Sequence, residues 1–373
     1  DAGLYHLPYV SFLNENKIVF GLTNIHFRFG TISIMQYLSA INNNFFLKDI
    51  GIVIPLASIA TFFIYYFFLK VLEIFKKYNN ININHVFSLF IIIFISYKIN
   101  RYSSFGNDAI AHLSFFYLVS KIIEKKDLNL PLIFLLAIFC FLNKTMMVVV
   151  LLVPFILFLK NFQLKNFKLI FSMGGLLLIL WIVKNIIISG CAVYPIKQSC
   201  IKNLYWSDIE EVKAESISGE AWAKDWPNIT NKDMTMENYI KKFRWFQTWK
   251  NNHGIKFLKI TIPYFILIIL LSILISRKNH SDKIFIKERS SLKILLIISF
   301  LGLLLFFIKF PLFRYGYSYL ITFFTLFLIF LTKTYNYNKL IKYSKIIFII
   351  CIIVIFGKQT QRYVKNFQSS YLL

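Results

Sequence analysis

The stretch IGIVIPLASIATFFIYYFFLKVLEI, residues Ile50–Ile74, decides the fold class of this chain. Its 25 residues include one lysine and one glutamate, both among the last five. A bilayer core of about 30 Å is crossed by roughly 20 apolar helical residues. The stretch therefore predicts a membrane-spanning helix, and the rest of the sequence can be compared with it.

Other stretches repeat this pattern. Three are similarly long and apolar: Phe167–Ser189, Ile255–Ile275 and Leu292–Ile308. Shorter candidates are Val86–Tyr97, Ala109–Ile123, Tyr317–Leu331 and Ile346–Phe356. A single helix over Pro131–Leu159 would bury Lys144 in hydrocarbon at a cost of at least about 3 kcal/mol, so two short helices meeting at Asn143-Lys144 are expected. The prediction is an all-α, polytopic transmembrane protein with about ten membrane segments.

Composition excludes two other classes of protein. The chain is 57% hydrophobic and 16% charged, whereas soluble domains carry about 25% charged residues and disordered chains are rich in charge. Its formal net charge is +25, from 42 Lys and Arg against 17 Asp and Glu. In so apolar a chain this excess is typical of cytoplasmic loops, and no nucleic-acid partner is expected.

The positions of the basic residues predict the orientation. With residues 1–48 outside, the inside turns hold 18 Lys and Arg, while the outside turns around Arg101, Lys144 and Arg314 are sparse in charge. The inside turns contain Lys76 and Lys77; Lys121, Lys125 and Lys126; Lys160, Lys165 and Lys168; Arg277 to Lys293; and Lys333 to Lys345.

Five regions follow from this orientation. They are a first outer loop (1–49), membrane helices (50–189, with the short helix pair at 131–159), an extracytoplasmic loop domain (190–254), further membrane helices (255–356) and an outer tail (357–373). The loop domain holds eight of the 17 acids and five of the six tryptophans. A loop of this length without structure would be unusual, so we expect it to fold, with helix over Met234–Asn251.

The cysteines and the chain start add two expectations. Cys191 and Cys200, nine positions apart, either close a small disulfide loop or remain two buried thiols. Cys140 and Cys351 lie in apolar runs and are expected in the core. The chain begins at Asp1 in a polar segment placed outside, so we expect a membrane helix or signal peptide upstream.

Polar residues that could carry chemistry gather on the outside rim. They are Asp1 and His6, then Arg101, Asp108 and His112, then Lys144, and finally Arg314. The topology puts them on one side of the membrane, where they can converge on one cavity. A carboxylate beside such cations suits a reaction on a lipid-linked phosphate, because the cations bind the phosphate and the carboxylate takes a proton.

Each of these residues also has a purely structural interpretation. Asp108 can cap the helix that follows it, and the cations can reach toward lipid headgroups. The histidines can be buried structural residues, and the tryptophans can form an interfacial aromatic belt. No metal site or cofactor is predicted, because the sequence shows no ligand constellation; use of a divalent cation is left open.

Three segments resemble a known family: Asp1–Pro8 (DAGLYHLP), Leu13–Ile18 and Leu142–Thr145. Two more, Cys191–Pro195 and Gly219–Trp226, resemble related membrane proteins of surface-polysaccharide gene clusters. Asp1–Pro8 looks like the first outer loop of bacterial polytopic glycosyltransferases of the GT-C superfamily. The paired short segments and the later large loop are similar to that superfamily as well. The resemblance covers most of the chain loosely, and Tyr-His-Leu-Pro is its most specific motif.

The resemblance implies a transferase that uses a polyprenyl-phosphate-linked sugar donor and a glycan or lipid acceptor. Its active site would face outward from the bacterial inner membrane, in the synthesis of a cell-surface polysaccharide. Asp1 takes the position of the catalytic base. Many such enzymes have two adjacent acids there, whereas Ala2 follows Asp1 and the next acid is Glu15. A base from elsewhere therefore stays open, with Asp108, Glu220 and Asp225 as the alternatives.

The candidate site residues fall into a catalytic group and a substrate-binding group. Asp1, His6 and Asp108 are the catalytic candidates, and Trp222 with Trp226 would form a platform for a sugar ring or lipid. The candidate donor-phosphate and substrate contacts are Arg101, Lys144, Arg314, Glu220, Trp222, Asp225 and Trp226. A polysaccharide polymerase or ligase is the alternative enzyme, and a non-catalytic or transporter subunit is the alternative class. A transporter should carry ionisable residues near the midplane, whereas these helix interiors are mostly apolar.

Overall fold

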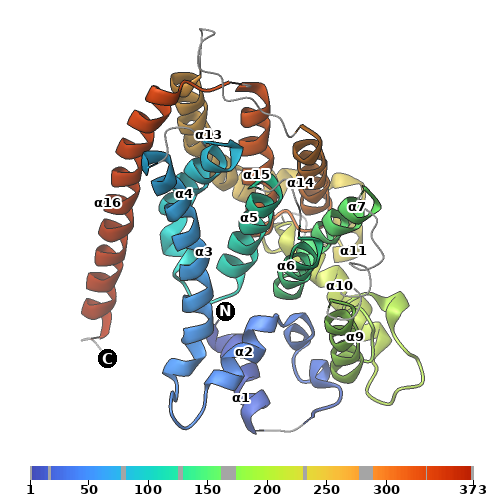
Figure 1. The fold of residues 1–373 in the computed structure, drawn as a ribbon. Coiled ribbons are helices and arrows are strands. Elements are labelled where there is room, and N and C mark those ends of the chain that lie inside the picture. The colour runs from blue at the N-terminus through green and yellow to red at the C-terminus, as the bar shows by residue number, and fades with distance from the viewer. Residues whose placement is uncertain are drawn as a thin grey trace.

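The computed structural model is predominantly helical in the residues that it describes (Figure 1). These are residues 2–15, 18–76, 81–124, 129–160, 174–229, 233–276, 289–332 and 334–370. Within these ranges the β pairing is limited to two isolated bridges, Cys191 with Cys200 and Ser276 with Tyr335. Several residues that carry sequence-based predictions lie outside the described ones: Asp1, the first part of Phe167–Ser189, and the inside-turn cations Lys77, Lys125, Lys126, Lys165, Lys168, those from 277 to 288, and Lys333.

Six helices in the described part of the chain are long and apolar enough to cross a membrane. They are α3 (Ile50–Lys76), α4 (Ile83–Tyr102), α13 (Ile255–Ile275), α14 (Arg289–Lys309), α15 (Phe313–Thr332) and α16 (Tyr337–Ser370). Shorter helices between them are α5 (Asp108–Glu124), α6 (Leu130–Asn143), α7 (Leu152–Lys160) and α9 (Leu176–Ser189). The architecture is that of a multi-pass membrane protein, and it confirms the all-α class.

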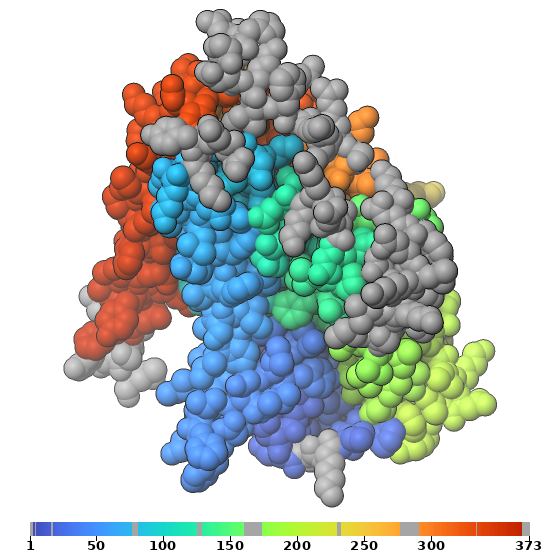
Figure 2. Space-filling view, in the orientation of Figure 1, coloured from blue at the N-terminus to red at the C-terminus, as the bar shows by residue number. Residues whose placement is uncertain are grey.

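Two of these helices, α4 and α5, form the centre of the bundle. Helix α4 is apolar around its whole circumference, and 16 of its 20 residues are buried. A helix that is hydrophobic all round is stable only when other helices surround it. By contrast, α3 and α16 lie at the edge of the bundle and leave many apolar side chains exposed (Figure 2).

The chain leaves the helical conformation at Lys144. Helix α6 starts at an Asn129 side chain that accepts a hydrogen bond from the amide of Leu132. It ends at Asn143, and Lys144 is extended (φ −156°, ψ 114°) before a 3-10 helix, η4 (Thr145–Leu151), begins. A lysine inside a continuous membrane helix would meet hydrocarbon; the break instead brings Lys144 to one end of the bundle.

Short helices cover that same end, which we call the α1 end (Figure 1). They are η1 (Ala2–His6), α1 (Leu7–Glu15), η2 (Leu22–Asn24), η3 (Phe27–Thr31) and α2 (Ile34–Asn42). Helix α2 starts at Ser33, whose hydroxyl accepts a hydrogen bond from the Met35 amide. The C-terminal end of α4 and the N-terminal end of α5 also lie at the α1 end, because Phe105 between them contacts the His6 ring.

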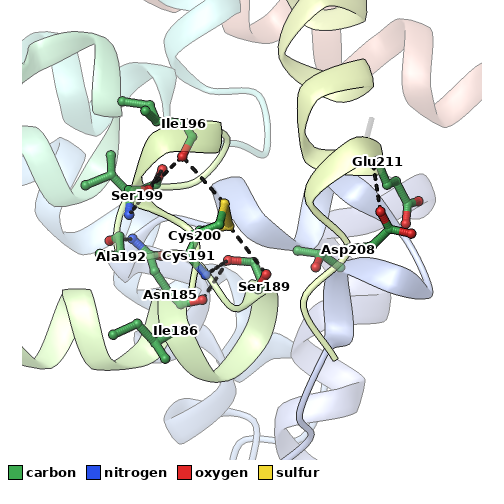
Figure 3. The surroundings of a disulfide bond; sticks show 12 residues. Asn185, Ile186, Ser189, Cys191, Ala192, Ile196, Ser199, Cys200, Asp208 and Glu211 are labelled. Atoms are coloured by element: carbon green, nitrogen blue, oxygen red, sulfur yellow. Dashed lines mark hydrogen bonds between the residues drawn. A yellow bond between two sulfur atoms is a disulfide. The ribbon is translucent and has the colours of Figure 1, made fainter. Parts of the chain in front are cut away.

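The segment 190–254 begins with a tightly closed loop (Figure 3). Gly190 ends α9 with φ 74°, where a Cβ would collide with Ser207. Cys191 and Cys200 then form a disulfide, which decides between the two alternatives left open by the sequence. The Asp208 side chain next accepts from the amide of Glu211 and starts α10 (Ile209–Ala223). Cys140 and Cys351 are buried free thiols, as expected.

The later part of this segment is less regular than the expected helix over Met234–Asn251. It contains α11 (Met236–Ile240) and α12 (Phe246–Trp249), with left-handed backbone at Lys242 (φ 52°) between them. The break lets Tyr239, Trp245 and Trp249 bury their rings together with Ala221 in a small core.

Candidate functional site

Asp108 is the centre of a charge cluster at the α1 end. Its Oδ2 lies 2.5 Å from Arg101 Nη2, and its Oδ1 accepts a hydrogen bond from Lys144 Nζ. The three residues come from the end of α4, the start of α5 and the break after α6. The Asp108 and Lys144 side chains are only 14% and 9% exposed, whereas Arg101 is 47% exposed. Two cations thus hold one carboxylate, and one of them faces outward.

The start of α15 adds Arg314 to this cluster. Its backbone carbonyl accepts hydrogen bonds from Lys144 Nζ (3.2 Å) and from His112 Nε2 (2.8 Å). With Nε2 as the donor, His112 Nδ1 is left to accept from the hydroxyl of Tyr102 at 3.3 Å. His112 therefore anchors the start of α15 to α5.

An aromatic ring lies beneath two of the cations. Lys144 Nζ is 4.3 Å, and the Arg314 guanidinium 5.1 Å, from the centroid of the Tyr315 ring. A ring face attracts cations, so Tyr315 holds the two positive groups side by side without neutralising them.

The first segment lies against this cluster. His6 is buried, its Nδ1 lies 2.5 Å from Gln36 Nε2, and its ring meets Phe105 edge to face at 6.1 Å. The Arg28 guanidinium is 5.0 Å from the Tyr5 ring. The charges of Asp108, Arg314 and Arg28 act on both Tyr5 and His6.

The electrostatic surroundings differ between Asp108 and His6, two of the catalytic candidates. Burial would raise the pKa of the Asp108 carboxyl, but the neighbouring charges, Lys144 first, hold that pKa well below its usual range. Both Asp108 oxygens are already engaged with cations, so this carboxylate is a weak proton acceptor and a strong orienting group. Burial lowers the pKa of His6 to about 4, so its imidazole is neutral at pH 7.

A cavity opens beside His6. Its volume is about 760 Å³, and Phe105 belongs to its lining. Ser11, Asn14 and Glu15 line it from α1, and Asp49 lines it from the start of α3, together with apolar side chains. Its polar groups include two carboxylates and no cation, in contrast to the adjacent Asp108 cluster.

Glu220 and Asp225 form a second group on the segment 190–254. Glu220 binds Lys224 (2.5 Å) and Lys309 (3.1 Å), the last residue of α14. Asp225 has φ 75°, and its Oδ1 lies 3.3 Å from His253 Nε2. Its carboxylate also accepts hydrogen bonds from the side-chain Nδ2 groups of Asn228 and Asn252. These contacts fold the segment onto itself and onto α14.

The two tryptophans of this group differ in environment. The Trp222 side chain is 58% exposed, whereas the Trp226 ring packs edge to face on Tyr239 at 5.2 Å. Only Trp222 presents a large free face. Trp249 connects this segment to the turn between α14 and α15. Its indole N–H donates to the carbonyl of Pro311 at 2.6 Å, and Pro311 lies three residues before Arg314.

The structure therefore brings together Arg101, Asp108, Lys144 and Arg314, with His6 and His112 beside them. Glu220, Trp222, Asp225 and Trp226 form the separate second group, and Asp1 lies outside the described residues. The described part of the chain holds no group of three or more His, Cys, Asp or Glu that could bind a metal ion.

Sequence reasoning missed several neighbours of the cluster. Tyr315 lies on α15, Gln36 on α2, Phe105 in the turn between α4 and α5, and Asp49 directly before α3. Only Tyr315 carries a signal, as the aromatic residue that follows Arg314 at a helix start. The other three are placed by tertiary contacts alone.

One family model matches the chain. The family model described as "Domain of unknown function (DUF8201)" matches residues 1–321, and the chain belongs to that family. No curated protein and no solved structure matches the chain. The matched range includes the Asp108 cluster and the segment 190–254, and ends within α15.

Proposed function

We propose that this DUF8201 protein is an integral membrane glycosyltransferase that takes a sugar from a polyprenyl-phosphate-linked donor. The observation that carries the proposal is the group of three cations around Asp108. Lys144 and Arg101 bind that carboxylate, and Arg314 shares the Tyr315 ring with Lys144. Among the described residues, three positive groups lie around the Asp108 carboxylate, and an incoming phosphate can accept contacts from them.

In this proposal the cations bind the donor phosphate and stabilise the charge that grows on it as the sugar leaves. Preorganised cations in a site shielded from water are worth far more than in solution. Asp108 is a positioning residue, because its oxygens hold Lys144 and Arg101 toward the place of the phosphate. The Tyr315 ring keeps Lys144 and Arg314 together despite their like charges.

The cavity beside His6 accommodates the acceptor, a glycan or a lipid with a free hydroxyl. Its carboxylates, Glu15 and Asp49, repel a phosphate but accept hydrogen bonds from sugar hydroxyls. The resemblance to GT-C enzymes assigns the base to Asp1; His6, neutral at pH 7, is the other group of the first segment able to accept a proton. Trp222 offers an exposed ring face for a sugar or lipid.

The same proposal includes the finer topology. It comprises about ten membrane segments, with the α1 end and a folded 190–254 domain on the outer face of a bacterial inner membrane. The pathway is the synthesis of a cell-surface polysaccharide. The six long apolar helices and the separate small core of 190–254 support this arrangement.

The test separates phosphate binding from catalysis. The full chain in nanodiscs is titrated with polyprenyl phosphate, and transfer is followed with a polyprenyl-phosphate-linked sugar. Lys144→Met should weaken binding of the lipid phosphate, whereas Asp1→Asn should abolish transfer and leave that binding intact. Lys70→Met is the matched control, since Lys70 is a similarly enclosed lysine bonded to a carboxylate on α5, but at the opposite end of that helix.

Two results contradict the proposal. One is undiminished lipid-phosphate binding by Lys144→Met in a protein that remains folded. The other is equal loss of binding in Lys144→Met and Lys70→Met, which would trace the effect to the fold and not to the site. Wild-type transfer by Asp1→Asn would remove Asp1 as the base and leave His6 to be tested by His6→Gln.

A further inference from the structure

A second group of cations lies where α16 crosses the end of α4. We define the α4–α16 group as Lys98, Arg101, Lys358 and Arg362. The ammonium groups of Lys98 and Lys358 lie 5.5 and 5.3 Å from the centroid of one ring, that of Tyr97. Lys98 is also repelled by the like charges of Lys358 and Arg101. Four positive side chains therefore converge at this junction.

The contacts that hold the two α16 cations are to uncharged groups. Lys358 Nζ donates to the backbone carbonyls of Ser96 (3.2 Å) and Tyr97 (2.7 Å). Arg362 Nη1 donates to the carbonyl of Asn100 (3.4 Å) and to Ser103 Oγ (2.5 Å). Cations near the last turn of a helix also interact favourably with its dipole. This fixes the position of the cations without cancelling their charge.

The group has too few acids to balance it. Among the described residues, the carboxylate that contacts it is Asp108, through Arg101, and Asp108 is also bonded to Lys144. Lys98, Lys358 and Arg362 have no carboxylate partner within that part of the chain. Donors also remain: a guanidinium carries five N–H groups and an ammonium three, and the bonds of Arg362 start from Nη1 alone. The junction is ready to receive an anion.

The surroundings decide which kind of anion fits. On α16, Ile349, Ile350, Ile353 and Phe356, in the turns that precede Lys358, are large exposed side chains, and Figure 1 shows this helix on the edge of the bundle with its outer side unpacked. An anion at this place lies next to an apolar helix face that lipid chains would cover. Tyrosines such as Tyr97 are typical of the membrane interface.

We propose that the α4–α16 group binds the phosphate headgroup of an anionic phospholipid. The headgroup lies among Lys98, Lys358 and Arg362, and its acyl chains run along the exposed face of α16. Arg101, half exposed between this group and Asp108, joins the two sites. The inference does not rest on the proposed transferase activity, since the ligand is a constituent of the membrane and undergoes no reaction.

The experiment measures lipid retention by native mass spectrometry. The full chain in micelles is titrated with phosphatidylglycerol or with phosphatidylcholine, and no sugar donor is present. The wild type is expected to retain phosphatidylglycerol in preference to phosphatidylcholine. The variant Lys98→Gln/Lys358→Gln/Arg362→Gln should bind it about fivefold more weakly for each cation removed.

A matched control removes the same charge from the other end of the same helix. Lys339→Gln/Lys342→Gln/Lys345→Gln deletes three exposed lysines near the start of α16 and should leave this retention unchanged. The conservative Lys358→Arg should retain the lipid as well. If the triple variant at the junction does not fold, Arg362→Gln alone, on the outer helix, should still weaken retention.

Three outcomes overturn the inference. Equal retention of phosphatidylglycerol by the wild type and by folded junction variants excludes the site. An equal loss of phosphatidylglycerol retention in the junction and control variants would show that retention depends on net charge and not on this site. Displacement of the lipid by inorganic phosphate at millimolar concentration, with no preference for the lipid form, would assign the junction to free phosphate.

Discussion

Glu124 and Asp108 lie at opposite ends of one helix, α5, about 25 Å apart by helix geometry, and two cations hold each of them. Glu124 binds Lys70 at 2.5 Å and Lys121 at 3.0 Å, much as Asp108 binds Arg101 and Lys144. The difference lies in the charge balance. Glu73 adds a second carboxylate to the Glu124 end, whereas the Asp108 end adds Arg314 and adjoins the α4–α16 group.

The comparison separates an ion-pair network that joins helices from the proposed phosphate site. At the Glu124 end the described residues in the group are two carboxylates and two lysines, and the hydroxyl of Tyr66 also donates to Glu124 (3.2 Å). Such a group is already satisfied and joins α3 to α5. At the Asp108 end the described residues are three cations and one carboxylate, which is the basis of the proposed phosphate site. In the proposed function, similar side chains thus have different roles at the two ends of α5, according to the numbers of cations and carboxylates.

The largest expected effect is that of Lys144→Met at the Asp108 end. The substitution removes a preorganised positive charge and leaves Asp108 with Arg101 alone, so transfer should fall by about 100-fold or more. The measurement is the initial rate of sugar transfer in nanodiscs. A loss below about threefold in folded protein would show that Lys144 does not contact the reacting phosphate.

The converse substitution is Glu124→Gln at the opposite end. It leaves Lys70 and Lys121 to share Glu73, and it should destabilise the fold by about 1–3 kcal/mol, less than a fully buried pair because these side chains are partly exposed. Thermal unfolding in micelles measures the effect. The transfer rate at low temperature should stay near that of the wild type; a strong loss of rate without loss of stability would contradict the structural role.

A smaller effect is expected from Arg101→Gln. Arg101 is 47% exposed and contributes one of the two cations on Asp108, so transfer should fall by about tenfold and less than in Lys144→Met. Lipid retention at the α4–α16 group should also weaken. If Arg101→Gln costs more transfer than Lys144→Met, the outer cation makes the main phosphate contact.

The smallest effect concerns pH and His6. Burial lowers its pKa in the folded protein from 6.5 to about 4, so between these pH values the unfolded chain binds the proton more tightly. Stability should therefore fall as the pH drops from about 6.5 toward 4. Between pH 7 and pH 5, the unfolding temperature of His6→Gln should fall less than that of the wild type. The same slope in both proteins would contradict a buried neutral His6.

Much of the fold could be read from the sequence, because membrane helices are encoded locally. The run Ile50–Ile74 became α3, and the lysine inside Pro131–Leu159 marked the end of α6, since hydrocarbon excludes both polar backbone and charge. The prediction of one continuous helix over Met234–Asn251 is wrong, because the chain forms two short helices, α11 and α12, with a break between them. There the small core of Tyr239, Trp245 and Trp249 outweighs local helix preference.

The sequence by itself determined the all-helical class, the membrane character and the residue types able to bind a phosphate. Only the tertiary structure decided that Arg101, Lys144 and Asp108, from separate helix ends, meet in one cluster while Glu220 and Asp225 do not join it. Likewise it alone paired Lys98 with Lys358, 260 positions apart. The reason is physical: hydrophobicity acts residue by residue along the chain, whereas charge balance depends on which helix ends the packing brings together.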